Sequence, residues 1–191
     1  KKIIRSKRIL DILFELKKKN FVLFKDKLNF KYPGGQGYLP HIDGHFFWKD
    51  KFSIYQKGWK KYSNNFINFV LPLDKSNLKN GCIYLSKKSD TKKIGNNFKK
   101  ITKNLIINTP NIKNKDIKKF KFYPIILDPG DVCFFDWKCA HYSKNNLSRK
   151  SRIIFYATYC EKNKKSNIRK NYYMDKYSSK SDLKNKSLLF N

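Results

Sequence analysis

Acidic residues are scarce in this chain: 14 Asp and Glu stand against 44 Lys and Arg, and the formal net charge is +30. A strong positive field attracts nucleic acid and anionic membrane surfaces, so both are raised as partners. The excess is almost all lysine, is spread along the whole chain, and accompanies many Asn, Ile, Phe and Tyr residues, as in proteins from AT-rich genomes. We therefore interpret it mainly as a solvated lysine surface, whose basic rim could attract an acidic substrate.

Long apolar runs are also missing, and so is a signal-peptide pattern at the start, which predicts a protein without a membrane span. The four cysteines lack the paired spacing of zinc ligands, and most of them adjoin apolar runs. We expect reduced core thiols and a cytoplasmic location. The cysteines are Cys82, Cys133, Cys139 and Cys160.

The composition is that of a folded domain, with 191 residues, 40% hydrophobic and 16% aromatic. This length suits one domain with a real core, and no internal repeat argues for more. We expect a single domain over residues 1–191, with a polar C-terminal extension over 161–191. Because no initiating Met is present, we also expect the N-terminal part of the domain to be missing.

One amphipathic helix over residues 3–18 is followed by short runs typical of strands. Several strands without alternating helices predict an antiparallel sandwich or barrel. A type II turn is expected at 128–131, where Pro and Gly occupy its central positions. Residues 86–121 predict a long functional loop, and tyrosines at 172, 173 and 177, with Met174, could pack a late helix. The expected strands are 21–24, 28–32, 46–48, 66–71, 82–85, 122–127, 132–137 and 152–159.

The candidate chemistry begins at His41-Ile42-Asp43. Residues two apart in a strand project from the same face, so His41 and Asp43 could bind one metal while Ile42 points into the opposite layer. His141 follows another apolar strand and could supply a third ligand. Two imidazoles and one carboxylate form the facial triad of non-haem iron oxygenases.

An arginine eleven residues after His141 completes the pattern. Arg152 opens a strand, and its planar guanidinium could hold a carboxylate through two parallel hydrogen bonds, with Ser143 adding a third. Arg149 is the alternative clamp, although it lies in a polar loop. His45 also lies two residues from Asp43 and is interpreted as a surface or pocket residue.

These segments together resemble the phytanoyl-CoA dioxygenase (PhyH) family of iron(II) and 2-oxoglutarate oxygenases. The resemblance covers about residues 29–160 and rests on the combination of motifs and their spacing. The motifs are Leu39-Pro40-His41-Ile42-Asp43, Asn80-Gly81-Cys82-Ile83, Pro129-Gly130-Asp131-Val132-Cys133-Phe134-Phe135, His141-Tyr142-Ser143 and Arg152.

The resemblance implies a mainly β fold, the double-stranded β-helix or cupin-like jelly roll with flanking helices, with iron at one open end of the barrel. It implies that His41, Asp43 and His141 bind Fe(II), and that Arg152, assisted by Ser143, binds the distal carboxylate of 2-oxoglutarate. Asn29 falls near a family position that contacts the other end of the cosubstrate, and Lys31 is an equal candidate there. Phe47 and Trp48 follow the acid closely and could wall the site or belong to the core.

The implied enzyme is a dioxygenase that uses O2 to hydroxylate a small organic molecule, with succinate and CO2 as co-products. The lysine-rich surface makes an anionic molecule a candidate substrate. The carboxylate of Asp43 favours hydroxylation over halogenation, because related halogenases lack it. Two alternatives stay open: a basic nucleic-acid-binding module on a degenerate jelly roll, and the same oxygenase acting on a nucleic acid or a protein side chain. The sequence does not identify the substrate or the carbon that is oxidised.

Overall fold

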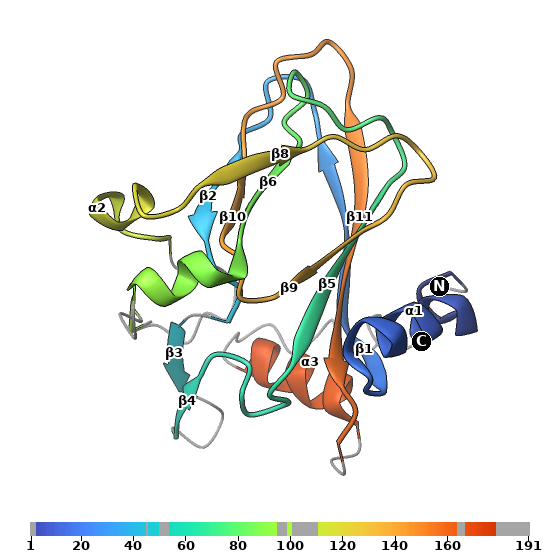
Figure 1. The fold of residues 1–191 in the computed structure, drawn as a ribbon, viewed down its shortest axis with the longest axis vertical. Helices are drawn as coiled ribbons and strands as arrows, with labels where there is room; N and C mark the ends of the chain where they lie inside the picture. Colours follow the sequence, from blue (N-terminus) through green and yellow to red (C-terminus); the bar gives the residue numbers. More distant parts are fainter. Residues whose placement is uncertain are drawn as a thin grey trace.

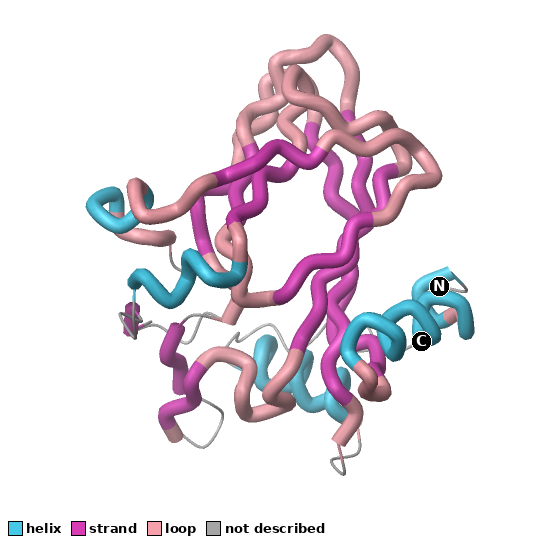
Figure 2. Tube along the Cα trace, in the orientation of Figure 1, coloured by secondary structure: helices cyan, strands magenta, loops and turns pink. Residues whose placement is uncertain are grey.

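Two antiparallel four-stranded sheets form the body of the protein (Figure 1). The structure is a computed structural model that describes residues 3–44, 46–49, 54–94, 99–100, 111–163 and 167–178. The tube view shows the strands of the two sheets surrounding a common interior (Figure 2). The fold is the predicted double-stranded β-helix. The first sheet has the order β1 (Phe21–Lys31), β11 (Arg152–Glu161), β5 (Phe66–Pro72), β9 (Cys133–Asp136), and the second β2 (Tyr38–His41), β10 (His141–Ser143), β6 (Ile83–Ser86), β8 (Phe122–Ile125).

The sequence predicted most strands of the two main sheets, with an error at β1 and omissions at β2 and β10. Strands were predicted over 21–24 and 28–32, but β1 runs without a break because its lysines continue the pairing with β11. The predicted runs did not include β2 and β10, because neither is an apolar or clearly alternating run. The strand assumed for His41-Ile42-Asp43 ends at His41. A small third sheet was also only partly foreseen. It has the order β4 (Tyr55–Lys57), β3 (Phe46–Lys49), β7 (Lys99–Lys100).

The turn at 128–131 forms as expected. The Asp131 N–H donates to the Asp128 carbonyl oxygen at 3.0 Å, and Gly130 has a φ of +102°, which a side chain would make unfavourable. The turn lies between β8 and β9, which belong to different sheets. It therefore carries the chain from one layer of the barrel to the other.

Helix α1 (Lys7–Lys17) covers the outer face of the first sheet. The predicted helix over 3–18 is divided at Ser6, which accepts a hydrogen bond from the Ile9 N–H as N-cap and follows a short 3-10 turn, η1 (Ile3–Arg5). The apolar side of α1 packs into one core cluster with Ile4 of η1 and residues of β1, β5 and β11. The buried members are Ile4, Ile9, Leu13, Phe21, Ile67, Phe69, Ala157 and Tyr159.

Helix α3 (Ile168–Ser178) packs against a second core cluster. Tyr172 is buried and its ring lies 4.5 Å from that of Phe24, so the expectation that the tyrosines of the tail pack a helix on the barrel is met there. Met174 is largely exposed, and the side chain of Tyr177 lies outside the described residues. The cluster comprises Phe24, Trp59, Tyr62, Phe66, Trp137, Cys160, Ile168 and Tyr172.

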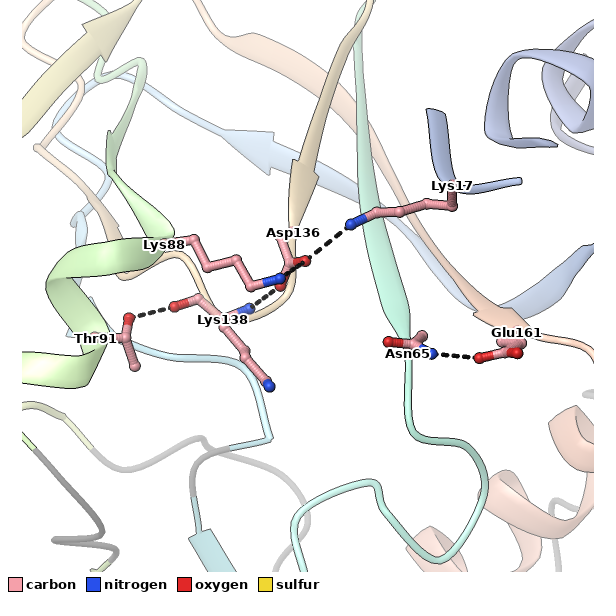
Figure 3. A network of polar contacts seen from close by, with 7 residues as sticks. All are labelled: Lys17, Asn65, Lys88, Thr91, Asp136, Lys138 and Glu161. Carbon is pink, nitrogen blue, oxygen red and sulfur yellow. Dashed lines mark hydrogen bonds and ion pairs between the residues drawn. The ribbon is translucent and has the colours of Figure 1, made fainter. Parts of the chain in front are cut away.

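A polar network connects α1 and the predicted loop region, residues 86–121, to strand β9 (Figure 3). Lys17 of α1 and Lys88 of η2 (Lys88–Ile94) both reach the Asp136 carboxylate, at 3.1 and 2.8 Å. Burial by itself would raise the pKa of Asp136, but hydrogen bonds from Lys88, the Lys138 N–H and Lys17 lower it below its usual value. The network therefore ties part of the predicted loop region to the sheet. That region also holds α2 (Asn114–Ile117), while 95–98 and 101–110 lie outside the described residues.

The helices in the described part of the chain are too short or too polar to cross a membrane.

Replacing Tyr172 with Ala should show whether α3 belongs to the folded barrel. The buried ring contacts Phe24, Tyr62 and Tyr173, and removing a buried aromatic side chain costs about 3–5 kcal/mol. Urea denaturation followed by circular dichroism should show a loss of that size. The matched control Met174→Ala, at an exposed position of the same helix, should lose less than about 1 kcal/mol. Equal losses in both variants would contradict this packing.

Candidate metal and cosubstrate site

The three predicted metal ligands lie together inside the barrel. His41 ends β2 and His141 begins β10, and the two residues are directly paired in the ladder between these strands. Asp43 follows in a turn, while Ile42 is buried in a separate cluster behind the strand. The donor atoms of all three ligands lie within 4.8 Å of one another. The distance from His141 Nε2 to Asp43 Oδ2 is 3.9 Å.

Both imidazoles are oriented by backbone carbonyl groups. His41 Nδ1 donates to the Leu39 oxygen at 2.7 Å, and His141 Nδ1 donates to the Cys139 oxygen at 3.1 Å. A histidine that donates from Nδ1 keeps Nε2 unprotonated and available as a ligand. The geometry therefore presents two Nε2 lone pairs beside one carboxylate.

The carboxylate of Asp43 is oriented by a polar relay that the sequence did not reveal. Thr158 Oγ1 donates to Asn68 Oδ1 at 2.7 Å, and Asn68 Nδ2 donates to Asp43 Oδ2 at 2.7 Å. Lys25 Nζ lies 4.0 Å from the other carboxylate oxygen. The available signal was Asn68 itself, a polar residue within the apolar strand β5.

The electrostatics keep the three ligands unprotonated at neutral pH. Burial, followed by the neighbouring His141, lowers the pKa of His41 to about 4. Burial also lowers the pKa of His141. Burial would raise the pKa of Asp43, but the charges of Lys25, His141 and His41 and the hydrogen bond from Asn68 lower it to about 2. Two neutral imidazoles and one ionised carboxylate fit a divalent iron ion.

The other end of the site contains two buried cations. Arg152 Nη1 donates to the Gly81 oxygen at 2.6 Å, and Nη2 donates to Asn29 Oδ1 at 2.9 Å. Lys31 Nζ donates to Ser143 Oγ at 2.9 Å and to the Lys144 oxygen at 2.7 Å. Ser143 also accepts from the Tyr38 N–H. The predicted cosubstrate residues Arg152, Ser143 and Asn29 are thus brought together, and Lys31 joins them.

Within the described residues, neither Arg152 nor Lys31 forms an ion pair, and the buried Arg152 Nε has no hydrogen-bond partner. Burial, followed by the charge of Arg152, lowers the pKa of Lys31 to about 8. Burial likewise lowers the pKa of Arg152. Buried charges are normally paired, so this end of the site fits an incoming carboxylate.

The structure also shows where some of the alternative site residues lie. Arg149 is exposed in its loop, away from the buried pair, whereas Arg152 is 1% exposed. Asn29 was expected near the other end of the cosubstrate, but its side chain is bound by the guanidinium of Arg152. His45 and the side chains of Phe47 and Trp48 lie outside the described residues.

The family model for phytanoyl-CoA dioxygenase (PhyH) matches residues 8–154. The chain belongs to the PhyH family. Relatives of this PhyH-family chain include the 2-aminoethylphosphonate dioxygenase of uncultured bacterium HF130_AEPn_1, 30% identical over 151 residues, which are 79% of this chain and 50% of the relative. The dioxygenase lolE1 of Epichloe uncinata is 25% identical over 171 residues, 90% of this chain and 58% of that protein. The chain therefore spans about half the length of these curated relatives.

A solved structure with a similar fold is that of the epimerase SnoN in complex with Fe3+, alpha ketoglutarate and nogalamycin RO. It superposes with a TM-score of 0.54 at 15% identity, covering 81% of this chain and 55% of that one. At this identity the likeness supports the fold of the PhyH-family chain alone.

Removing the amide that orients Asp43 should weaken metal binding. We expect Asn68→Leu to raise the dissociation constant for Fe(II) by about 10–100-fold, because partners that orient a ligand typically contribute this much. The constant is measured by competition with a chelator under argon. Asn65→Leu, at the start of the same strand segment where the amide reaches Glu161 instead, is the matched control and should change it little. An unchanged constant in Asn68→Leu would contradict the relay.

The lowered pKa values of the histidines also predict how metal binding depends on pH. Protons compete for an imidazole only near its pKa, so the Fe(II) affinity should stay flat from pH 8 to 6 and fall only as the pH approaches about 4. Two imidazoles at an ordinary pKa near 6.5 would instead lose on the order of a hundredfold between pH 7 and 5.5. A loss of that size in the chelator competition would show that burial does not lower the pKa values of these histidines.

Proposed function

We propose that this chain is an Fe(II)- and 2-oxoglutarate-dependent dioxygenase that hydroxylates a small organic molecule. One observation carries the proposal. A histidine–aspartate–histidine triad lies in the same barrel as a buried arginine and a buried lysine, which form no ion pair with the described residues. The first set has the donors that iron(II) takes, and the second has the charge that a dicarboxylate requires. Membership of the PhyH family and the dioxygenases among its relatives support this assignment.

His41 Nε2, Asp43 and His141 Nε2 would hold the metal. The hydrogen bonds at the two Nδ1 atoms prevent the rings from turning, and Asn68 fixes the carboxylate plane. Iron and 2-oxoglutarate, when bound with O2, supply the oxidant for hydroxylation, with succinate and CO2 as co-products. The presence of the Asp43 carboxylate favours hydroxylation over halogenation.

Arg152, Lys31 and Ser143 would hold the distal carboxylate of the cosubstrate. Asn29 and the Gly81 carbonyl fix the guanidinium through Nη2 and Nη1. The ring of Phe135 packs edge-on against His141, with centroids 5.2 Å apart, and shields this side of the triad from water. The fixed donors reduce the reorganisation needed when the cosubstrate binds.

Two alternative functions make different experimental predictions. A basic module that only binds nucleic acid would bind random oligonucleotides with a steep salt dependence and no effect of metal. The same oxygenase acting on a nucleic acid or a protein side chain would form succinate faster with an oligonucleotide or peptide present. The formed triad favours an enzyme over a pure binding module. A substrate screen read by succinate and product mass starts with 2-aminoethylphosphonate, the compound in a relative's name.

The cosubstrate assignment is tested by a visible charge-transfer band on anaerobic addition of Fe(II) and 2-oxoglutarate. The band should form with the full chain and be absent in Asp43→Ala. In Arg152→Met the dissociation constant for 2-oxoglutarate should rise by about 100-fold, because two charge-assisted hydrogen bonds are lost. Arg149→Met is the matched control and should behave as the unmodified chain.

Arg152→Lys covers the case in which the Met variant does not fold, since it keeps the charge and should bind 2-oxoglutarate with intermediate affinity. Circular dichroism checks the fold of each variant. Absence of the band in the unmodified chain, or an equal loss in the Arg149 and Arg152 variants, would refute the proposed function or its cosubstrate site.

A further inference from the structure

A row of basic side chains lines the inner face of β1. Residues two apart in a strand share a face, and the register pairs Lys25, Lys27, Asn29 and Lys31 with Thr158, Tyr156, Ile154 and Arg152 of β11. Two hydrogen bonds show that these side chains point into the barrel. Lys31 donates to Ser143 at one end of the row, and Arg152 donates to Asn29 in the middle. The row therefore extends from the cosubstrate end toward the metal triad.

Lys25 faces inward because the pairing of β1 with β11 is unbroken from Lys25 to Lys31, so that Lys25 shares one face with Lys27, Asn29 and Lys31. A β-bulge lies directly before it. The pairing steps from Leu23 opposite Tyr159 to Lys25 opposite Thr158, so Phe24 is the extra residue. Phe24 is completely buried in the core cluster with α3, beside the first lysine of the row.

Lys25 lies where a molecule beside the metal would meet it. Its Nζ is 3.8 Å from the centre of the Trp59 ring and 4.0 Å from Asp43 Oδ1, and its side chain keeps 27% exposure. Among the described residues its ion pair with Asp43 is long, at 4.0 Å, so the half-buried ammonium is poorly neutralised there.

Lys27 stands next in the row and is exposed. Its Nζ lies 5.0 Å from the ring centre of Tyr38 and 5.5 Å from that of Tyr156, one ring from each sheet. In the described part of the chain it forms no ion pair. The intervening residue, Asp26, is bound by Arg169 of α3 and does not neutralise the row.

The charges of the proposed enzyme leave these two lysines without an anion. Arg152 and Lys31 match the distal carboxylate of the cosubstrate, and Asp43 gives its charge to the metal. Lys25 and Lys27 would then lie near a divalent cation with no carboxylate of their own, which is unfavourable unless an anion joins them. We propose that Lys25 and Lys27 bind the anionic head group, a phosphonate or a carboxylate, of the substrate. This inference rests on the proposed function.

The experiment distinguishes this substrate subsite from two other roles of the lysines. If Lys25 only neutralises Asp43, its removal changes metal binding and no substrate effect is seen. If Lys27 contacts the cosubstrate, its removal weakens 2-oxoglutarate binding. A substrate subsite leaves the dissociation constant of 2-oxoglutarate within about threefold in both Met variants, because the cosubstrate does not use these ammonium groups. Lys27→Met should also leave the dissociation constant of Fe(II) within about threefold, whereas Lys25→Met can change it through the contact of Lys25 with Asp43.

The experiment titrates methylphosphonate and propionate into the anaerobic Fe(II)–2-oxoglutarate complex of the full chain and follows the charge-transfer band. Dimethyl methylphosphonate and methyl propionate are the neutral counterparts. We expect at least one anion to shift the band and neither neutral ester to do so. Lys25→Met and Lys27→Met should each raise the dissociation constant of that anion by about tenfold or more. Lys25→Arg should restore part of the affinity, and Lys121→Met, an exposed lysine elsewhere, should change nothing.

The inference is overturned if neither anion shifts the band, if the neutral esters bind equally well, if both Met variants bind as the unmodified chain does, or if they lose 2-oxoglutarate to the same degree. A stronger effect of one anion identifies the head group. If Fe(II) and 2-oxoglutarate give no band at all, the proposed function fails, and the 31P line of methylphosphonate is then followed with metal-free protein. Broadening that is lost in Lys25→Met would keep the anion subsite, and no broadening would remove it as well.

Discussion

The pairing of β2 with β10 places His41 opposite His141, and the rest of the site depends on this register. A shift by one residue would turn every side chain of a short strand to the other face of the sheet. The two rings lie 4.2 Å apart between centroids, and Asp43 follows in the adjoining turn. Because β10 also pairs with β6, the second sheet as a whole holds the two imidazoles in place.

Strand β11 connects the metal end of this site with its anion-binding end. Thr158 begins the relay through Asn68 to Asp43, and Arg152, six residues earlier on the same strand and face, is the proposed carboxylate clamp. β1 pairs with β11 along its length and adds the row of lysines opposite these residues. The inner wall of the first sheet is therefore positively charged, and Asp43, in the turn after β2, faces Lys25.

The sequence was sufficient to predict the architecture and the grouping of three candidate metal ligands, and insufficient for the residues that orient them. His41, Asp43, His141 and Arg152 have defined spacing and chemistry, so they could be proposed as site residues without coordinates. The relay through Asn68 depends on β5 pairing with β11, a contact between residues 90 positions apart that no local pattern encodes. The inward direction of Lys25 depends on the register of β1 with β11, which also has no reliable local signal. The short strands β2 and β10, which hold His41 and His141, were missed because neither is an apolar or clearly alternating run.

The central claim is that one metal and one dicarboxylate share this barrel, and a crystal structure of the full chain grown under argon with Fe(II) and 2-oxoglutarate tests it most directly. The account predicts iron bound by His41 Nε2, Asp43 and His141 Nε2, with the distal carboxylate of 2-oxoglutarate on Arg152 and Lys31. Iron held by His45 in place of His41, or the dicarboxylate bound away from Arg152, would contradict it.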